Sequence, residues 1–333
     1  MDEQLMAQAR GGDAAAFSRL TEPFRRELQL HCYRIVGSVG EAEDLVQETL
    51  LAAWQGMAEF QGRSSVRTWL YRIATNRCLN AVRDRERRPK PAFETRKNLP
   101  EPTRHLEVTW LEPYPDTLLA SLNDPAPGPL ARVESREAIS LAFATTMQTL
   151  PPRQRAILLL RDVLGYHGAE VAGMLDTTEN AVASGLKRAR AALAARESAS
   201  PSPLPGSPTE RRIIDAFVSA FERGDVDDLV ALLTDDAAVN MPPLSQEYVG
   251  HDAVTHFFAE ISFAHGANEF RLVPTRANGQ PAFGRYVRDP RARISHAHGL
   301  TVLTLDGDRI AQVTSFMDTA LFPRFGLPRI LPD

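Results

Sequence analysis

The sequence contains only two cysteines in 333 residues, Cys32 and Cys78, and they do not form a CxxC pair. This spacing argues against a disulfide scaffold and against a zinc site built from thiolates. The chain also lacks any apolar run approaching ~20 residues. It begins without the basic residues that open a secretory signal. We therefore expect a cytoplasmic protein that does not associate with membranes.

A strong overall charge is also absent, because the formal net charge is only −4. The charge is nevertheless uneven along the chain. Residues 60–97 hold eleven basic and three acidic side chains, whereas residues 198–333 carry a net charge of −5. Nucleic-acid binding must therefore be judged from local patterns rather than from the total charge.

Proline-rich segments divide the chain into domains. Nine of the 24 prolines lie between residues 89 and 129, and residues 198–206 are rich in proline and serine. Both compositions are typical of linkers. The pattern predicts a first domain at 1–90, a linker at 91–129, a second domain at 130–197, a short linker at 198–206, a third domain at 207–325 and a tail at 326–333.

The first predicted domain contains an acidic helix. Apolar residues recur at helical spacing between residues 42 and 54, and the opposite face carries Asp44, Gln47 and Glu48. Between residues 40 and 59 there are five acidic residues and no basic one. Taken alone, this pattern is typical of a solvated acidic face.

The stretch that follows combines basic, amide and aromatic side chains on one helix face. Spacings of three or four residues align Trp69, Arg72, Asn76, Asn80 and Arg83. Arginine contacts phosphates, asparagine reads base edges, and an aromatic ring stacks on unpaired bases. The alternative is a solvated basic helix whose tryptophan belongs to the core, and the residues alone do not decide between the two.

The second predicted domain has the pattern of a helix-turn-helix. One helix opens at the proline pair 151–152, a short helix follows at 169–175, and a second helix spans 179–193 after a turn. The alternative is an ordinary three-helix bundle. The outward polar residues of the last helix include Ser184, Lys187, Arg188 and Arg190.

Together, these features resemble the extracytoplasmic-function sigma factors of the bacterial sigma-70 family. Three stretches carry the resemblance, residues 43–49, 65–76 and 150–190, in the order of the family's regions 2 and 4. The resemblance implies two all-α domains that bind core RNA polymerase and promoter DNA. It implies no catalytic residue, no cofactor and no metal in this chain, since the polymerase makes the bonds.

The resemblance also assigns roles to individual residues. Those that would bind core polymerase are Asp44, Gln47 and Glu48. Those that would bind the −10 element are Phe60, Arg63, Ser64, Arg67, Trp69, Arg72, Asn76, Asn80 and Arg83. Those that would bind the −35 element are Thr178, Glu179, Ser184, Lys187, Arg188 and Arg190. The chain has small residues at Ala181, Ala183 and Gly185, where the family usually has long polar ones. We therefore expect the −35 contact to be the weaker one.

The third predicted domain places helices before strands, an α+β pattern. A capping box at 207–210 opens a helix that stops at Gly224. Further helices are expected at 225–233 and 252–262. Strands are expected at 237–241, 269–275, 281–287, 294–305 and 309–317. The pattern resembles the cone-shaped SnoaL-like fold of the nuclear-transport-factor type. Candidates to line a pocket for an unidentified small ligand are Tyr248, His256, Tyr286, His296, His298 and Asp318.

We therefore expect an alternative sigma factor that is regulated in cis by its third domain. Residues 110–116 in the linker and 278–282 in the third domain resemble motifs of sigma factors with such an extension. Two other functions stay open. One is a one-component transcription regulator with a ligand-sensing domain, and the other is a SnoaL-like enzyme fused to a transcription module.

Overall fold

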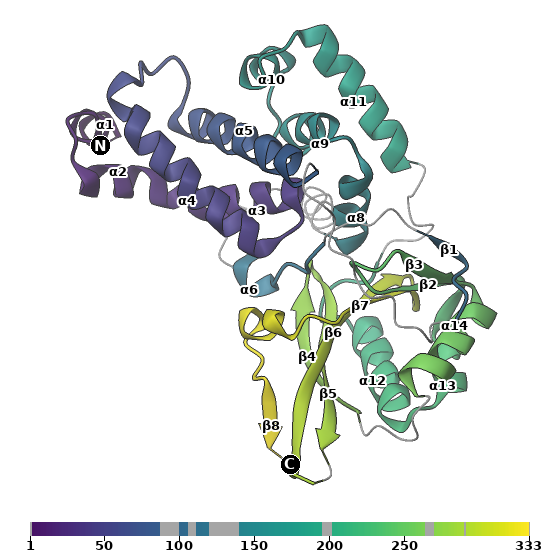
Figure 1. Cartoon of the computed structure of the whole chain (residues 1–333). Helices are drawn as coiled ribbons and strands as arrows, with labels where there is room; N and C mark the ends of the chain where they lie inside the picture. The colour runs from purple at the N-terminus through teal and green to yellow at the C-terminus, as the bar shows by residue number, and fades with distance from the viewer. Residues whose placement is uncertain are drawn as a thin grey trace. The chain divides into compact units, whose positions relative to one another are not determined.

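The computed structural model describes residues 2–86, 100–105, 111–119, 140–194, 202–263, 270–289 and 291–332 (Figure 1). These residues form two compact units. The first unit contains the described residues up to 86 and from 144 to 194. The second unit contains those at 100–105, 111–119 and 140–143, and those from 202 onward.

The amino-terminal part of the first unit is helical. Its helices are α1 (Asp2–Arg10), α2 (Ala14–Thr21), α3 (Arg25–Val36), α4 (Val39–Gly56) and α5 (Val66–Glu86), with 3-10 turns at Glu22–Phe24 and Met57–Glu59. Asp13 caps α2 by accepting two amides of its first turn, and Ser38 caps α4 by accepting the amide of Glu41. Gly37 ends α3 with a φ of 82°, a left-handed conformation that glycine adopts without strain.

Helices α3, α4 and α5 enclose the core of this part. The ring of His31 on α3 lies 2.8 Å from Oγ1 of Thr75 on α5. Burial, together with two nearby guanidinium groups, lowers the pKa of His31 to about 3, so its ring is neutral near pH 7. Cys32 and Cys78 are both buried free thiols.

Between residues 140 and 194, which are all described, the helices are α8 (Leu141–Thr149), α9 (Pro152–Leu158), α10 (Gly168–Met174) and α11 (Glu179–Ala194). A π-helical turn, Leu159–Val163, continues α9. The amide of His167 donates to the Glu170 carboxylate at 2.7 Å and starts α10, while Thr178 Oγ1 accepts the amide of Ala181 at 3.2 Å and starts α11. Helices α10 and α11 with their connecting turn are the helix-turn-helix expected from the sequence.

The second unit combines helices with one eight-stranded sheet. The helices are α6 (Asp116–Leu119), α12 (Pro208–Arg223), α13 (Val226–Ala231) and α14 (His251–Phe257), with a π-helical turn at Phe258–Ser262 and a 3-10 helix at Thr319–Phe325. The strands are β1 (Arg104–His105), β2 (Leu233–Asn240), β3 (Gln246–Val249), β4 (Phe270–Ala277), β5 (Gln280–Asp289), β6 (Ile294–Asp306), β7 (Arg309–Phe316) and β8 (Ile330–Pro332). The strand order is β1-β3-β2-β7-β6-β5-β4, and β8 pairs with β6. Only the β2–β7 pairing is parallel among the described strands.

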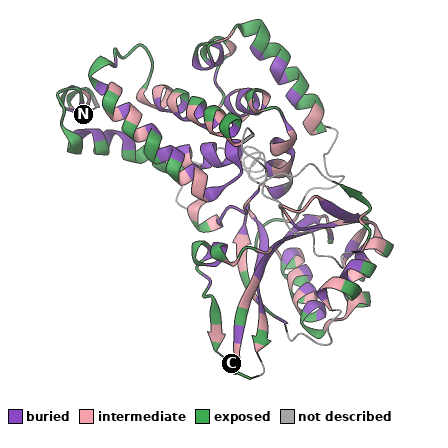
Figure 2. Ribbon diagram, in the orientation of Figure 1, coloured by how far each residue is buried: buried purple, intermediate pink, exposed green. Residues whose placement is uncertain are grey.

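Helix α12 covers one face of this sheet through an apolar stripe. Phe217 and Phe221 lie in the stripe one turn apart, and both are almost completely buried. The ring of Phe217 stacks on that of Phe283 from β5, with centroids 5.7 Å apart. Figure 2 shows buried residues along the strands and along the side of α12 that faces them. This burial supplies the hydrophobic core of the second unit.

The fold class predicted from the sequence is confirmed, because two helical regions precede a helix-then-sheet domain. The strands expected at 269–275, 281–287, 294–305 and 309–317 are β4 to β7. The expected helix at 225–233 is shorter, because β2 begins at Leu233. The described parts of the predicted linker, residues 100–105 and 111–119, pack with the second unit and supply β1 and α6. Among the described residues, no helix is both long enough and apolar enough to cross a bilayer.

Candidate polymerase and nucleic-acid interface

Helix α4 presents an acidic face to solvent. Its apolar side, which includes Leu45 and Val46, is buried against the core. The same periodicity turns Asp44, Gln47 and Glu48 outward, and all three are exposed. The structure therefore brings together on one face the three residues predicted to bind core polymerase.

Helix α5 presents the basic and amide face. Arg72, Asn76, Asn80 and Arg83 are exposed along it. Arg63 and Ser64 are exposed in the segment that precedes the helix. Arg83 pairs with its neighbour in sequence, Asp84, at 3.2 Å, an exposed ion pair that DNA phosphates can replace at little cost.

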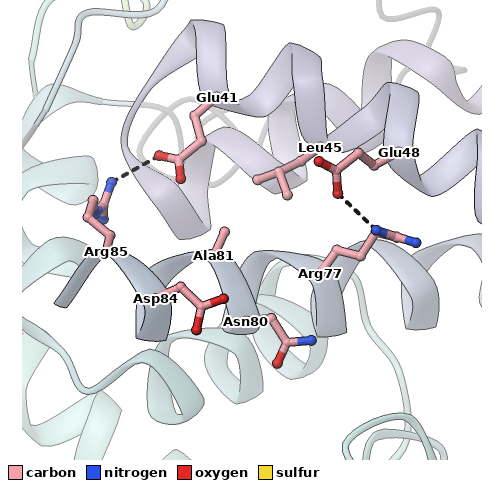
Figure 3. Close-up of a pocket in the computed structure, with 8 residues that line it drawn as sticks. All are labelled: Glu41, Leu45, Glu48, Arg77, Asn80, Ala81, Asp84 and Arg85. Atoms are coloured by element: carbon pink, nitrogen blue, oxygen red, sulfur yellow. Dashed lines mark hydrogen bonds and ion pairs between the residues drawn. The ribbon is translucent and has the colours of Figure 1, made fainter. Parts of the chain in front are cut away.

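A groove of about 540 Å³ separates the two helices (Figure 3). Ion pairs bridge the groove at two places. Arg77 Nη1 lies 2.8 Å from a carboxylate oxygen of Glu48, and Arg85 Nη1 lies 3.0 Å from one of Glu41. The groove is lined by Glu41, Leu45, Glu48, Arg77, Asn80, Ala81, Asp84 and Arg85. It therefore joins a predicted polymerase contact, Glu48, to a predicted DNA contact, Asn80.

Trp69 has features of both interpretations that the sequence left open. Its ring is half-buried and packs on the buried ring of Phe60, with centroids 4.6 Å apart. It also covers Gly56, whose hypothetical Cβ would lie 3.6 Å from the indole. The tryptophan thus fixes the loop before α5 while keeping part of its ring accessible. Its role in binding DNA stays a prediction.

Two further predicted −10 contacts, Arg67 and Asn76, bond residues of other helices in the first unit. The guanidinium of Arg67 donates three hydrogen bonds of 2.9 to 3.2 Å to the Glu27 carboxylate. It also lies 4.8 Å from the ring centroid of Tyr71. Asn76 donates to the carbonyl of Met174 in α10 at 3.1 Å. DNA would have to displace the carbonyl of Met174 from Asn76. The guanidinium of Arg67 is poorly suited to bind DNA, because it would have to leave both Glu27 and Tyr71.

Helix α11 carries the exposed residues predicted to read the −35 element. Thr178, Glu179, Ser184, Lys187, Arg188 and Arg190 are all exposed. Thr178 also serves as the helix cap. Arg190 forms two hydrogen bonds with Asp162, at 2.7 and 2.8 Å. Lys187 and Arg188 are the two cations of this face for which no carboxylate partner is described.

Gly185 lies away from the exposed side of α11 that carries the predicted DNA contacts, although its place in the sequence groups it with Ala181 and Ala183. It is buried, and a Cβ at this position would lie 2.7 Å from Cδ1 of Ile157 in α9. A glycine lets α11 approach α9 closely. Its presence is explained by packing against Ile157, whereas Ala181 and Ala183 are exposed.

The six pocket candidates of the third domain lie on several different elements. Tyr248 on β3 donates to the carbonyl of Pro100 at 3.0 Å, and Tyr286 on β5 donates to that of Pro328 at 2.7 Å. Asp318 caps the 3-10 helix that follows β7. The remaining candidates are His256, which pairs with Glu260, exposed His296, and His298, which lies beside Phe270. In the described part of the chain, no group of three or more His, Cys, Asp or Glu is arranged to hold a metal.

The turn between β4 and β5 binds the linker segment, a contact within the second unit that local patterns do not reveal. Asn278 and Tyr114 exchange two hydrogen bonds of 2.8 Å, and the amide of Gly279 donates to Asp116 at 2.8 Å. Asn278 has a φ of 56°, which asparagine tolerates better than most residues. Gln280 accepts the amide of Leu141, the first residue of α8, at 2.9 Å. Trp110 lies outside the described residues.

A partly buried charge network supports this turn. Arg276 bonds the carboxylate of Glu210 at 3.2 Å and that of Asp116 at 3.4 Å. Glu210 is 3% exposed and also accepts the amide of Gly206. Burial raises the pKa of Asp116, opposed by the Gly279 amide and the Arg276 guanidinium. The network ties together the linker, the turn and the start of α12.

Three family models match successive parts of the chain. Residues 20–88 match the Sigma-70 region 2 model, residues 140–193 match the Sigma-70 region 4 model, and residues 214–313 match the SnoaL-like domain model. Over 328 residues the chain is 45% identical to the ECF RNA polymerase sigma factor SigG of Mycobacterium tuberculosis, covering 97% of this chain and 86% of SigG. The chain belongs to the extracytoplasmic-function family of RNA polymerase sigma factors.

A second relative shares the three-part order of this sigma factor. This relative is the ECF sigma factor SigJ of M. tuberculosis, to which the chain is 29% identical over 265 residues. The alignment covers 76% of this chain and 77% of SigJ. The crystal structure of SigJ aligns with a TM-score of 0.59 at 24% identity, covering 92% of this chain and 97% of that one. The two proteins therefore share a fold that extends through the carboxy-terminal domain.

Within the sigma factor, Lys187→Ala with Arg188→Ala should weaken promoter binding by removing two cations that can pair with phosphates. We expect the slope of log affinity against log salt to fall by about one for each phosphate that is no longer neutralised. Fluorescence anisotropy of holoenzyme on labelled promoter DNA at several salt concentrations measures this slope. The matched control is Arg190→Ala, which removes a cation already paired with Asp162 and should change the slope less.

A promoter scan tests the separate expectation that the −35 contact is the weaker one. If base substitutions in the −35 element reduce transcription more than those in the −10 element, that expectation is wrong.

Proposed function

We propose that this sigma factor binds core RNA polymerase through the exposed face of α4 and recognises promoters through α5 and α11. We further propose that its SnoaL-like domain regulates it in cis. The observation that carries the proposal is that region 2 has two neighbouring helices whose exposed faces carry opposite charge. Acidic side chains line the exposed side of α4, and basic and amide side chains line the neighbouring side of α5.

The two faces suit two different partners. Asp44 and Glu48 are exposed carboxylates that complement a basic protein surface, and Gln47 between them can donate and accept hydrogen bonds. Arg72 and Asn80 suit single-stranded DNA, because arginine contacts phosphates and asparagine reads base edges. Asn76 would contact DNA only after releasing the carbonyl of Met174. Since both partners act in the bacterial cytoplasm, we place the protein there.

Run-off transcription tests the function directly. The purified chain is mixed with core RNA polymerase and a pool of promoter fragments, and the transcripts are sequenced. We expect initiation from a subset of fragments that share −10 and −35 elements, and none from core polymerase alone. Absence of transcripts above the core-only background would contradict the proposal.

The SnoaL-like domain is proposed to regulate rather than to catalyse. Two of the six pocket candidates, Tyr248 and Tyr286, use their hydroxyls to bond the backbone carbonyls of Pro100 and Pro328. The β4–β5 turn instead holds Tyr114 in the linker and Leu141 at the start of region 4. A domain that holds both segments is well placed to control the position of region 4.

Weakening this turn should change transcription while leaving the domain folded. Asn278→Gly retains the positive φ but removes the side-chain acceptor for Tyr114, and Gln280→Met removes the acceptor for Leu141. We expect each variant to alter the yield of run-off transcripts severalfold, in the same direction as a truncation after Ser198. Asp308→Ala, in the exposed β6–β7 turn, is the matched control.

Equal transcription by the parent, the turn variants and the truncation, at several salt concentrations, would show that the domain is a passenger. A shorter truncation at Leu321 is unsuitable for this purpose. It would remove Phe322 and Phe325, which are buried in the core of the second unit. Its effect would therefore report on folding as well as on regulation.

A further inference from the structure

The groove between α4 and α5 contains a contact that connects the two proposed binding faces. Glu48 reaches from α4 and Arg77 from α5, and Figure 3 shows their charged groups pointing toward one another across the groove. Arg77 Nη1 lies 2.8 Å from the carboxylate, yet the side chains are 38% and 56% exposed. An ion pair this exposed can exchange partners readily, because water and other charges compete for both groups.

We propose that Arg77 is a further DNA-binding residue, and that Glu48 holds it until core polymerase binds. The inference rests on the proposed function of the two faces. Arg77 directly follows Asn76 in α5 and lines the same groove as Asn80, so its guanidinium lies beside the proposed DNA face. A basic group of the polymerase that pairs with Glu48 releases Arg77, and the released guanidinium then contacts a phosphate of the melted strand.

The second ion pair of the groove behaves differently. Arg85 bonds Glu41 at 3.0 Å, but it also donates to the carbonyl of Val36 at 3.0 Å. The side chains of this pair are 35% and 30% exposed, less than those of Arg77 and Glu48. Loss of Glu41 therefore leaves Arg85 attached to α3. Of the two pairs described in the groove, the Glu48–Arg77 pair is the one that can exchange.

Such an exchange couples the two binding events. If polymerase binding raises the affinity of the sigma factor for DNA, then DNA binding must raise the affinity of the sigma factor for polymerase by the same factor. An exposed ion pair limits the size of the coupling to about fivefold. The device would keep the DNA affinity of the unbound sigma factor low and would raise it upon assembly.

The test uses the full chain with three single substitutions, Glu48→Gln, Arg77→Gln and, as the matched control, Glu41→Gln. Each variant is titrated onto a fluorescein-labelled forked DNA with a single-stranded non-template arm, alone and with core polymerase. Affinity for core polymerase is measured separately. Thermal melting of each variant verifies that these surface substitutions leave the fold intact.

Opposite effects are expected from the two partners. Glu48→Gln should weaken core binding but tighten DNA binding by the unassembled chain, by up to about fivefold. Arg77→Gln should leave core affinity unchanged or higher, and should lower both the DNA affinity of the holoenzyme and its salt slope, by about one. Glu41→Gln should change DNA affinity in neither state.

Two results would overturn the inference while sparing the proposed function. In the first, Glu48→Gln and Glu41→Gln have the same effect on DNA binding by the unassembled chain. In the second, the Arg77→Gln holoenzyme keeps the parental salt slope. If the parent chain itself fails to bind core polymerase, the proposed function is wrong, and the inference falls with it.

Discussion

Reversal of two charges on α4, Asp44→Arg with Glu48→Arg, should reduce the affinity for core RNA polymerase by at least about a hundredfold. Both side chains are exposed and lie on one helix face, so the substitutions place two cations where a basic partner surface would dock. Like charges brought together at an interface cost several kcal/mol. Titration of labelled core polymerase with the parent and the variant measures the change.

The fold should tolerate the two substitutions. Neither residue is buried, and Glu48 loses only an exposed ion pair with Arg77, which contributes at most about 1 kcal/mol. Asp215→Arg with Asp236→Arg is the matched control, because it makes the same change in net charge at exposed positions of the second unit. We expect the control to keep parental affinity. If the α4 variant keeps it as well, α4 is not the docking surface.

Local periodicity was sufficient to predict the helix faces of this protein. The spacing of Asp44, Gln47 and Glu48 placed them together, and all three are exposed in the structure. The capping box beginning at Ser207 was also predicted from the sequence, and in the structure the side chain of Ser207 accepts the amide of Glu210 at 3.2 Å. Features of this kind depend on residues three or four positions apart, and such spacings are visible in one sequence.

Contacts between distant residues could not be predicted in the same way. Arg67 was assigned to DNA, but it pairs with Glu27, 40 residues earlier. The contact between Asn76 and Met174 spans 98 residues, and that between Tyr114 and Asn278 spans 164. No periodicity records such pairs, because they depend on how separate helices and strands pack. The packing role of Gly185 was missed for the same reason, since its neighbour Ile157 belongs to another helix.

Arg155 is a buried cation that joins α9 to α3 within the first unit, and no local pattern in the sequence indicates this role. Only 3% of its surface is exposed. Its guanidinium donates to the carbonyl of Ile35 near the end of α3, and also to the carbonyls of Gln148 and Leu150 at 2.9 and 3.1 Å. Carbonyls at a helix C-terminus carry partial negative charge, so a cation is stabilised there.

Substitution of Arg155 by Met should destabilise the first unit by about 2–4 kcal/mol. Methionine fills a similar length of the site but leaves the buried carbonyls of Ile35 and Leu150, and the partly buried carbonyl of Gln148, without their donor. Each unsatisfied acceptor costs about 1–3 kcal/mol, and removal of the buried charge offsets part of this loss. Urea unfolding followed by tryptophan fluorescence measures the change, because Trp54 and Trp69 both lie in this unit.

Arg153→Met provides the control on the same helix. Arg153 is exposed and donates to the carbonyl of Leu175, so the substitution removes the same charge and hydrogen-bonding group at a position open to water. We expect the control to cost less than about 1 kcal/mol, because water can replace the missing donor. The two arginines therefore separate the effect of burial from the effect of charge. If both substitutions lower the free energy of unfolding equally, Arg155 does not hold α9 against α3 through its buried hydrogen bonds.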